Sequence, residues 1–142
     1  MSGVLVDTNV LSELMRPEPA REVMTWFAEH SGSQFYVSAI TQAEILLGIA
    51  LLPQGKRQES LARAAKEMFD QEFSGKCLPF AANCATIYAE VVAVRQKSGL
   101  PITTEDAQIA SIALVNGYAL ATRNVRDFEK ISDLRILNPW NS

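Results

Sequence analysis

The segment Val4-Leu5-Val6-Asp7-Thr8-Asn9 decides how this chain folds. Three consecutive apolar residues, two of them β-branched, predict a short buried strand at residues 4–6. The strand stops at a carboxylate followed by two small polar residues, so Asp7 is expected at the carboxyl end of a strand. In open α/β sheets this edge binds ligands, because the loops and helix N-termini that follow the strands converge there. An acid at that edge favours a cation as ligand.

The chain of 142 residues is predicted to form one domain, residues 1–142, with an ordinary hydrophobic core. Its composition, 48% hydrophobic and 20% charged, is typical of a globular protein, and no apolar run approaches the ~20 residues of a membrane span. Met1-Ser2-Gly3 places no basic residue ahead of the short apolar segment. We therefore expect no signal peptide, no membrane contact and a cytoplasmic location.

The cysteine, histidine and charge content excludes several kinds of site. Cys77 and Cys84 show no zinc-ligand spacing, and His30 is the only histidine, which argues against a zinc site and against His-based nucleophilic catalysis. Both cysteines are interpreted as small buried hydrophobic residues. A net charge of −3 weakens any binding of nucleic acid through a broad basic field, but it is compatible with a local basic rim around an acidic site.

Strand patterns and helix patterns alternate along the chain. Further strands are predicted at residues 34–38, 77–80, 118–122 and 135–137, with Pro79 placing the second of these at a sheet edge or strand end. Helices are predicted at residues 10–15, 20–30, 41–51, 56–72 and 82–97, and a last one from a cap at Thr103 or Thr104 to Asn116-Gly117. This alternation predicts an α/β fold with a central parallel sheet of about four to five strands, flanked by helices on both faces.

Two further acids, Glu44 and Asp106, stand in the first turn of apolar helices. Each shares its helix face with apolar or small residues three, four and seven positions later, so both are predicted to face the protein. A carboxylate buried there alone costs several kcal/mol and needs a hydrogen bond, an ion pair or a metal ion. A structural interpretation stays open, because Thr41 and Thr103 precede the two acids at capping-box spacing, and Asp7 can be a helix N-cap.

A fourth acid, Asp127, follows the strand predicted at residues 118–122. Carboxylates from separate segments that meet at one sheet edge repel one another, and a hard divalent cation relieves that repulsion. Oxygen ligands without Cys or His favour Mg²⁺, with Mn²⁺ possible, over zinc. We therefore predict a catalytic metal site formed by Asp7, Glu44, Asp106 and Asp127.

With these residues in place, the sequence resembles the PIN-domain family, and within it the VapC and FitB-type toxins of bacterial toxin-antitoxin systems. The resemblance covers essentially the whole chain. It rests on four motifs in this order: Val6-Asp7-Thr8-Asn9, Ala43-Glu44, Asp106-x-x-Ile109-Ala110 and Ala121-Thr122-Arg123-Asn124-x-x-Asp127-Phe128. The resemblance implies a single PIN domain, a metal-dependent endoribonuclease, a homodimer and a cognate antitoxin that blocks the site. It also implies that DNA is bound only indirectly, through the antitoxin.

Residue by residue, Asp7, Glu44 and Asp106 match the three core acids of that family. Many relatives carry an Asp two residues after the threonine, where this chain has the neutral Asn124, so Asp127 is the remaining acid of that loop. Whether Asn124 or Asp127 takes the fourth position, and whether one or two metal ions bind, stays open. The residues expected to support the ligands or to position water are Thr8, Asn9, Thr122 and Asn124.

The hypothesis is hydrolysis of an RNA phosphodiester by a metal-activated water, which leaves a 5′-phosphate and a 3′-hydroxyl. Arg16, Arg123 and Arg126 lie close in sequence to the acid-bearing loops and are predicted to contact RNA phosphate, although exposed solubilising charge also explains them.

Two other classes of protein compete with the nuclease. A receiver domain or a haloacid-dehalogenase-type phosphatase also carries an Asp after its first strand, but the phosphatase needs a second acid where this chain has Asn9. The other is an interaction module that keeps the fold, binds an antitoxin or another partner through an apolar groove, and has little catalysis. The amphipathic helices at residues 20–30 and 56–72 are then interface candidates, although core packing explains most of their apolar stripes.

Overall fold

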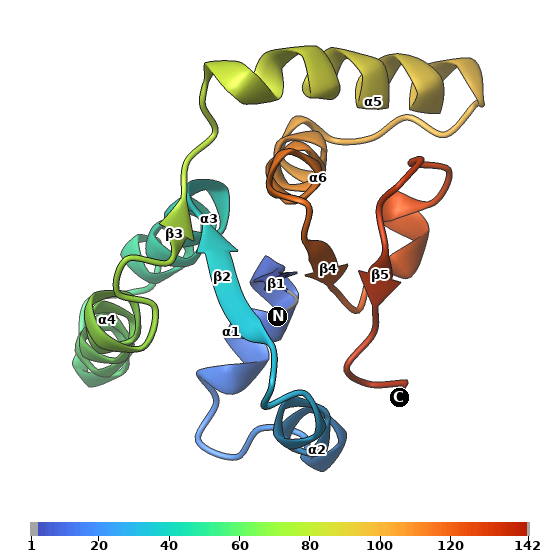
Figure 1. Cartoon of the computed structure of the whole chain (residues 1–142). Helices are drawn as coiled ribbons and strands as arrows, with labels where there is room; N and C mark the ends of the chain where they lie inside the picture. The colour runs from blue at the N-terminus through green and yellow to red at the C-terminus, as the bar shows by residue number, and fades with distance from the viewer. Residues whose placement is uncertain (1–2, 142) are drawn as a thin grey trace.

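The computed structural model describes residues 3–141 and shows a five-stranded sheet through the middle of the molecule (Figure 1). The strand order is β3-β2-β1-β4-β5, and all four neighbouring pairs are parallel. The strands are β1 (Gly3–Val6), β2 (Gln34–Ser38), β3 (Cys77–Leu78), β4 (Ala119–Ala121) and β5 (Ile136–Leu137). The predicted α/β fold is confirmed. The expectation of no signal peptide falls partly on residues 1–2, which lie outside the described residues.

The central strand β1 places Asp7. Leu5 pairs with Tyr36 of β2 on one side and with Leu120 of β4 on the other. Successive side chains of a strand point to opposite faces, and accordingly Leu5 and Val6 belong to two different cores. The residues from Val4 to Val6 are 0–1% exposed, as a strand covered on both faces requires. Asp7 therefore lies at the carboxyl end of a strand that is buried on both faces.

The helices connect the strands and cover both faces of the sheet (Figure 1). Within residues 3–141 they are α1 (Thr8–Leu14), α2 (Arg21–Glu29), α3 (Ala39–Ala50), α4 (Lys56–Glu67), α5 (Ala85–Lys97) and α6 (Thr104–Asn116). Shorter turns are the π-helix η1 (Met68–Glu72) and the 3₁₀ helices η2 (Ala82–Cys84) and η3 (Val125–Phe128). The helix predicted at residues 56–72 thus changes to a π-turn at Met68, where the amide of Phe73 bonds to the Met68 carbonyl at 2.9 Å.

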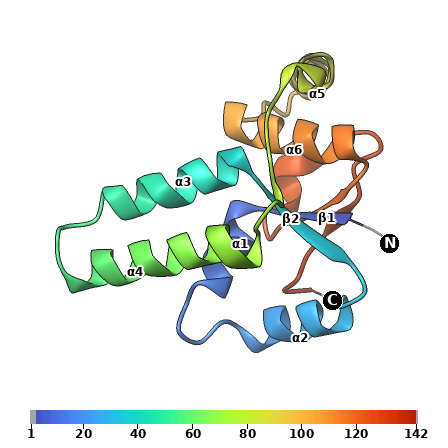
Figure 2. The same cartoon turned by 60° about the vertical axis from the view of Figure 1, so that its left-hand side comes forward.

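α3 and α4 form a helical hairpin that projects beyond the sheet (Figure 2). Thr41 and Ile45 are the buried residues of α3, whereas Leu47 and Leu51 are 59% and 75% exposed. The prediction of a buried stripe around Glu44 is therefore wrong, because Leu47, Leu51 and Glu44 itself are exposed. The physical reason is that α3 leaves the sheet along its length, so no layer of this chain covers its second apolar stripe.

The two cysteines differ in their surroundings. Cys84 is 1% exposed, as predicted. Cys77 is partly exposed, and its thiol donates to Gln42 Oε1 at 3.1 Å, so the prediction of burial is wrong for this residue. The reason is that Cys77 lies on β3, an edge strand of the sheet. In the part of the chain that the structure describes, every helix is too short or too polar to span a membrane.

Candidate active site

The carboxylate of Asp7 is buried at the carboxyl end of β1, with 4% of the residue exposed. Its backbone N–H donates to the Ala121 carbonyl at 2.9 Å, which joins it to β4. Its side chain also caps α1, because Oδ1 accepts a hydrogen bond from the Thr8 amide at 2.8 Å. The N-cap interpretation of Asp7 is thus confirmed. It leaves the metal role open, because each carboxylate oxygen has more than one lone pair.

Thr122 and Asn9 hold the other oxygen of Asp7. The Thr122 hydroxyl donates to Asp7 Oδ2 at 2.8 Å, and Asn9 Nδ2 donates to the same oxygen at 3.1 Å. Burial raises the pKa of Asp7 above its usual value, and the bond from Thr122 opposes that rise. The Thr122 hydroxyl also accepts the Asn124 amide at 3.1 Å. These contacts connect β1 to the loop after β4 around a single carboxylate.

Glu44 reaches this edge from α3. Thr8 Oγ1 donates to Glu44 Oε1 at 2.6 Å and lies 3.0 Å from Thr41 Oγ1. The capping box expected from Thr41 and Glu44 is wrong. Ser38 caps α3 instead, with its hydroxyl oxygen accepting the Thr41 amide at 3.0 Å. The last residue of β2 is therefore also the cap of the next helix, which leaves Glu44 free to contact Thr8.

Asp106 lies in the first turn of α6, where Thr103 is the cap and accepts the Asp106 amide at 3.1 Å. The residues that share its face, Ile109, Ala110 and Ala113, are buried as predicted. Burial, and next the negative charges of Asp7, Asp127 and Glu44, raise the pKa of Asp106 to about 6. Like charges raise a carboxyl pKa in this way when they lie near it, and these four carboxylates come from four separate segments.

The four acids form a cluster of separate carboxylates. Among residues 3–141, no three acidic, histidine or cysteine side chains are arranged as a ready-made metal site. Within the same residues, none of the four acids takes part in an ion pair with Lys or Arg. Asp127, in η3, is exposed, as is Asn124 just before it, and the structure does not show which of the two takes the fourth position.

A family model of the PIN domain matches residues 4–134, a span that includes all four acids. The chain belongs to the PIN domain family. Among its relatives, the plasmid stability protein StbB of Pseudomonas syringae pv. tomato is 42% identical over 98% of this chain and 99% of its own length. The VapC ribonuclease Y4jK of Sinorhizobium fredii is 36% identical over 96% of this chain and 97% of its own length.

The toxin FitB of Neisseria gonorrhoeae is 36% identical over 97% of this chain and 99% of its own length. A crystal structure of FitAcB from the same organism superposes with a TM-score of 0.86 at 35% identity, covering 98% of this chain and 99% of the other. These matches confirm the resemblance stated from the motifs, and they place this PIN domain among VapC and FitB-like proteins.

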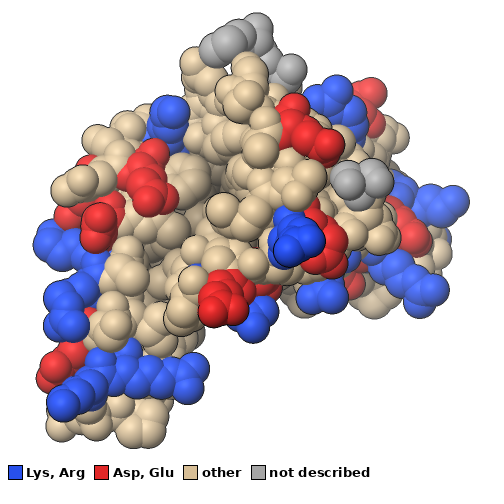
Figure 3. All heavy atoms as spheres, turned by 90° about the horizontal axis from the view of Figure 1, so that it is seen from below, with Lys and Arg blue, Asp and Glu red and all other residues tan. Residues whose placement is uncertain are grey.

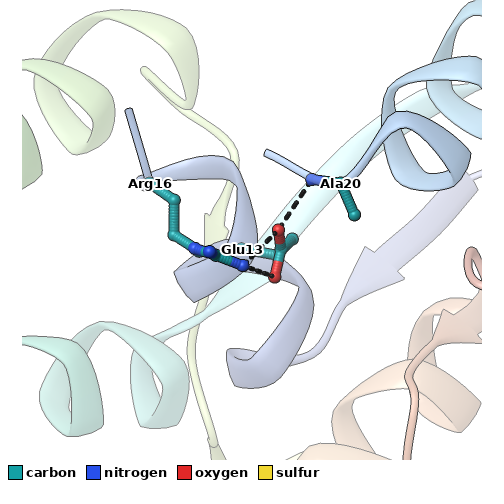
Figure 4. A network of polar contacts seen from close by, with 3 residues as sticks. All are labelled: Glu13, Arg16 and Ala20. Carbon is teal, nitrogen blue, oxygen red and sulfur yellow. Dashed lines mark hydrogen bonds and ion pairs between the residues drawn. The ribbon is translucent and has the colours of Figure 1, made fainter. Parts of the chain in front are cut away.

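Beside the acids, the PIN domain holds Arg16 through Glu13 (Figure 4). Glu13 is 8% exposed, and its Oε2 accepts the Ala20 amide at 2.7 Å and Arg16 Nη1 at 3.1 Å. The bond from Ala20 is the largest cause that lowers the pKa of Glu13. Glu13 therefore fixes both the arginine and the start of α2. Sequence reasoning missed Glu13, although an acid three residues before an arginine in a proline-containing loop is a usable signal.

Arg123 is held differently. Its guanidinium lies 4.8 Å from the ring centroid of Trp140, a cation–π contact, and its amide donates to Asn9 Oδ1 at 3.0 Å. Its charge also contributes to lowering the pKa of Glu13. Arg126 is exposed in η3. Trp140, near the end of the chain, carried no sequence signal for this role.

A groove of about 640 Å³ opens beside Glu44, between α1, α3 and α4. Its lining is mainly apolar, with Met15, Ile49 and Leu61 among its residues, and Arg16 forms part of its wall. On the face of the PIN domain seen in Figure 3, basic and acidic side chains are interspersed, and neither sign covers it. That face therefore carries no broad basic field, as the negative net charge of the sequence predicts.

Proposed function

We propose that this PIN domain is a metal-dependent endoribonuclease and the toxin of a toxin-antitoxin pair. One observation carries the proposal: four carboxylates come from separate segments at the carboxyl edge of the sheet, and the charges of the other three add to burial in raising the pKa of Asp106 to about 6. The names of the relatives, a VapC ribonuclease and the toxin FitB, support the reaction class and the biological role.

The donor set fits Mg²⁺ or Mn²⁺, because it consists of carboxylate oxygens that repel one another and lack basic partners among residues 3–141. Asp7 and Asp106 are the proposed principal ligands, and Glu44 and Asp127 contribute directly or through water. When bound, the metal supplies an activated water and stabilises charge on the phosphate and the leaving oxygen.

The other residues of the site orient these ligands and the substrate. Thr122 and Asn9 fix Asp7 through one oxygen, and Thr8 fixes Glu44. Glu13 forms an ion pair with Arg16, and Trp140 makes a cation–π contact with Arg123. We propose that these two arginines bind phosphates of the RNA, with Arg126 as a third contact.

The proposed partners follow from surfaces that this chain leaves uncovered. Leu46 and Leu47 of α3 and Leu51 at its C-cap are 46–75% exposed, and the apolar groove lies on the other side of the same hairpin. Contiguous exposed apolar residues are typical of protein interfaces. We propose that a homodimer and a cognate antitoxin cover these surfaces in the cytoplasm, and that DNA is contacted only through the antitoxin.

The same surfaces support a second candidate, an interaction module of the PIN fold with little catalysis. This candidate uses the same groove and the same exposed residues of the hairpin, but it gives the four acids no role. Loss of cleavage on substitution of one acid therefore separates the two functions.

The experiment is cleavage of a mixed RNA substrate by the purified, antitoxin-free protein with Mg²⁺, with Mn²⁺ and with EDTA. Asp7→Asn tests the site, because asparagine still caps α1 but brings no charge to a metal. Glu105→Gln is the matched control, an exposed acid next to Asp106. We expect metal-dependent cleavage by the wild type and the control, and none by Asp7→Asn. Equal silence of all three folded proteins would favour the interaction module.

A further inference from the structure

Arg95 of α5 is a buried cation without an acidic partner. The residue is 4% exposed, and among residues 3–141 it forms no ion pair. Arginine is rarely buried this deeply without a carboxylate, because removing the charge from water is costly. Its guanidinium is instead satisfied by carbonyl oxygens of two loops.

One of these loops carries Asp127. Arg95 Nη1 donates to the Glu129 carbonyl at 2.6 Å and lies 3.4 Å from the Arg126 carbonyl. These two carbonyls stand on either side of Asp127, in or directly after η3. Phe128, which follows Asp127, is 1% exposed and belongs to the core that also contains residues of α6. The segment is therefore held from inside the protein, while Asp127 stays exposed at the acid cluster.

The second loop precedes Asp106. Arg95 Nε donates to the Leu100 carbonyl at 2.7 Å, and the Leu100 amide bonds back to the Arg95 carbonyl at 2.9 Å. Leu100 lies between the end of α5 and the Thr103 cap of α6. One planar guanidinium thus joins the loop that leads to Asp106 with the loop that bears Asp127.

We propose that Arg95 is a positioning residue that fixes Asp127 at the acid cluster. A four-residue 3₁₀ turn makes few internal bonds and does not by itself set the direction of its side chains. The rigid fork of an arginine binds several acceptors in one fixed geometry, which an ammonium group does not reproduce. The role rests on the proposed function, since it assigns the cluster the task of binding a divalent cation.

The test is binding of Mn²⁺ to the metal-free full-length protein, followed by electron paramagnetic resonance. The variants are Arg95→Met, Asp127→Asn and their combination, with Lys97→Met, an exposed cation of the same helix, as control. We expect Arg95→Met to weaken Mn²⁺ binding about 10-fold, as is usual when support of a ligand is lost. Because both changes act through one carboxylate, the combination should be no more than about twofold weaker than Asp127→Asn.

The role of Arg95 alone would be overturned by an unchanged Mn²⁺ affinity in Arg95→Met, or by losses that multiply in the combined variant. If Arg95→Met does not fold, Arg95→Lys takes its place in the same cycle, with a smaller expected loss. Wild-type protein that neither binds Mn²⁺ nor cuts RNA would overturn the proposed function and this role together. Amide exchange should be faster at residues 124–130 in Arg95→Met, and unchanged exchange there would also contradict the proposal.

Discussion

Replacing Asp106 with asparagine should stabilise the metal-free protein at neutral pH. Burial and the charges of three neighbouring acids raise the pKa of this carboxyl from 3.8 to about 6. The pKa of Asp106 is higher in the folded state than in the unfolded state, so the protonated carboxyl stabilises the fold. This stabilisation is complete only below about pH 4, and it is lost as the pH rises through about 6. The Asp106→Asn variant has no such loss, so its advantage should grow over this window.

The magnitude follows from the size of the shift. About two pKa units correspond to roughly 3 kcal/mol between the two protonation states. The side chain is partly exposed, so solvent screening reduces this to about 1.5 kcal/mol. For a domain of this length that free energy corresponds to about 3–6 °C in melting temperature.

The assay is scanning calorimetry in EDTA from about pH 4 to pH 8, with Glu105→Gln as control. Both substitutions remove a negative charge from the first turn of α6, so their difference isolates the burial of Asp106 together with the repulsion within the cluster. Asp106→Asn should match the wild type near pH 4 and melt higher above pH 7, and Mg²⁺ should stabilise the wild type more than the variant. A variant no more stable than wild type and control at pH 7.5 would refute the reasoning.

Three further changes test other parts of the site. Thr122→Val removes a donor to the buried Asp7, so the free energy of unfolding at pH 7 should fall by about 1–3 kcal/mol in urea titration, and an unchanged midpoint would contradict the contact. Ser38→Ala removes the cap of α3 and should cost about 1 kcal/mol in the same titration; a smaller effect than that of an exposed Ser74→Ala control would show that Ser38 is not the cap. Arg123→Gln should raise KM for RNA with kcat nearly unchanged. It should also reduce the slope of log binding constant against log salt concentration by about 1, and an unchanged slope would argue against a phosphate contact.

Much of the fold could be predicted because local patterns and tertiary structure agree. The strand at residues 34–38 has the predicted bounds, since its apolar run is covered by helices. The predictions failed where one residue has two tasks or where the sheet ends. Ser38 closes a strand and caps a helix, so α3 begins at Ala39, and the projecting hairpin leaves Leu47 and Leu51 uncovered.

Glu44, in the second turn of α3, departs from the predicted helix start. Asp7 and Asp106 could be placed in the fold from the sequence, because Asp7 follows a strand and Asp106 stands in the first turn of a helix. The residues that hold the site could not. Glu13, Arg95 and Trp140 act through a backbone amide, backbone carbonyls and a cation–π contact, and none of these interactions leaves a periodic pattern. The orientation of Glu44 depends on how far α3 extends beyond the sheet, which periodicity does not encode.

The most direct test of the central claim is the chemistry of the RNA ends that the purified protein produces. Hydrolysis by a metal-activated water at the Asp7 and Asp106 edge predicts 5′-phosphate and 3′-hydroxyl ends, formed with Mg²⁺ and abolished by EDTA. Products with 2′,3′-cyclic phosphate ends, formed equally well in EDTA, would show attack by the RNA's own 2′-hydroxyl and would contradict the account.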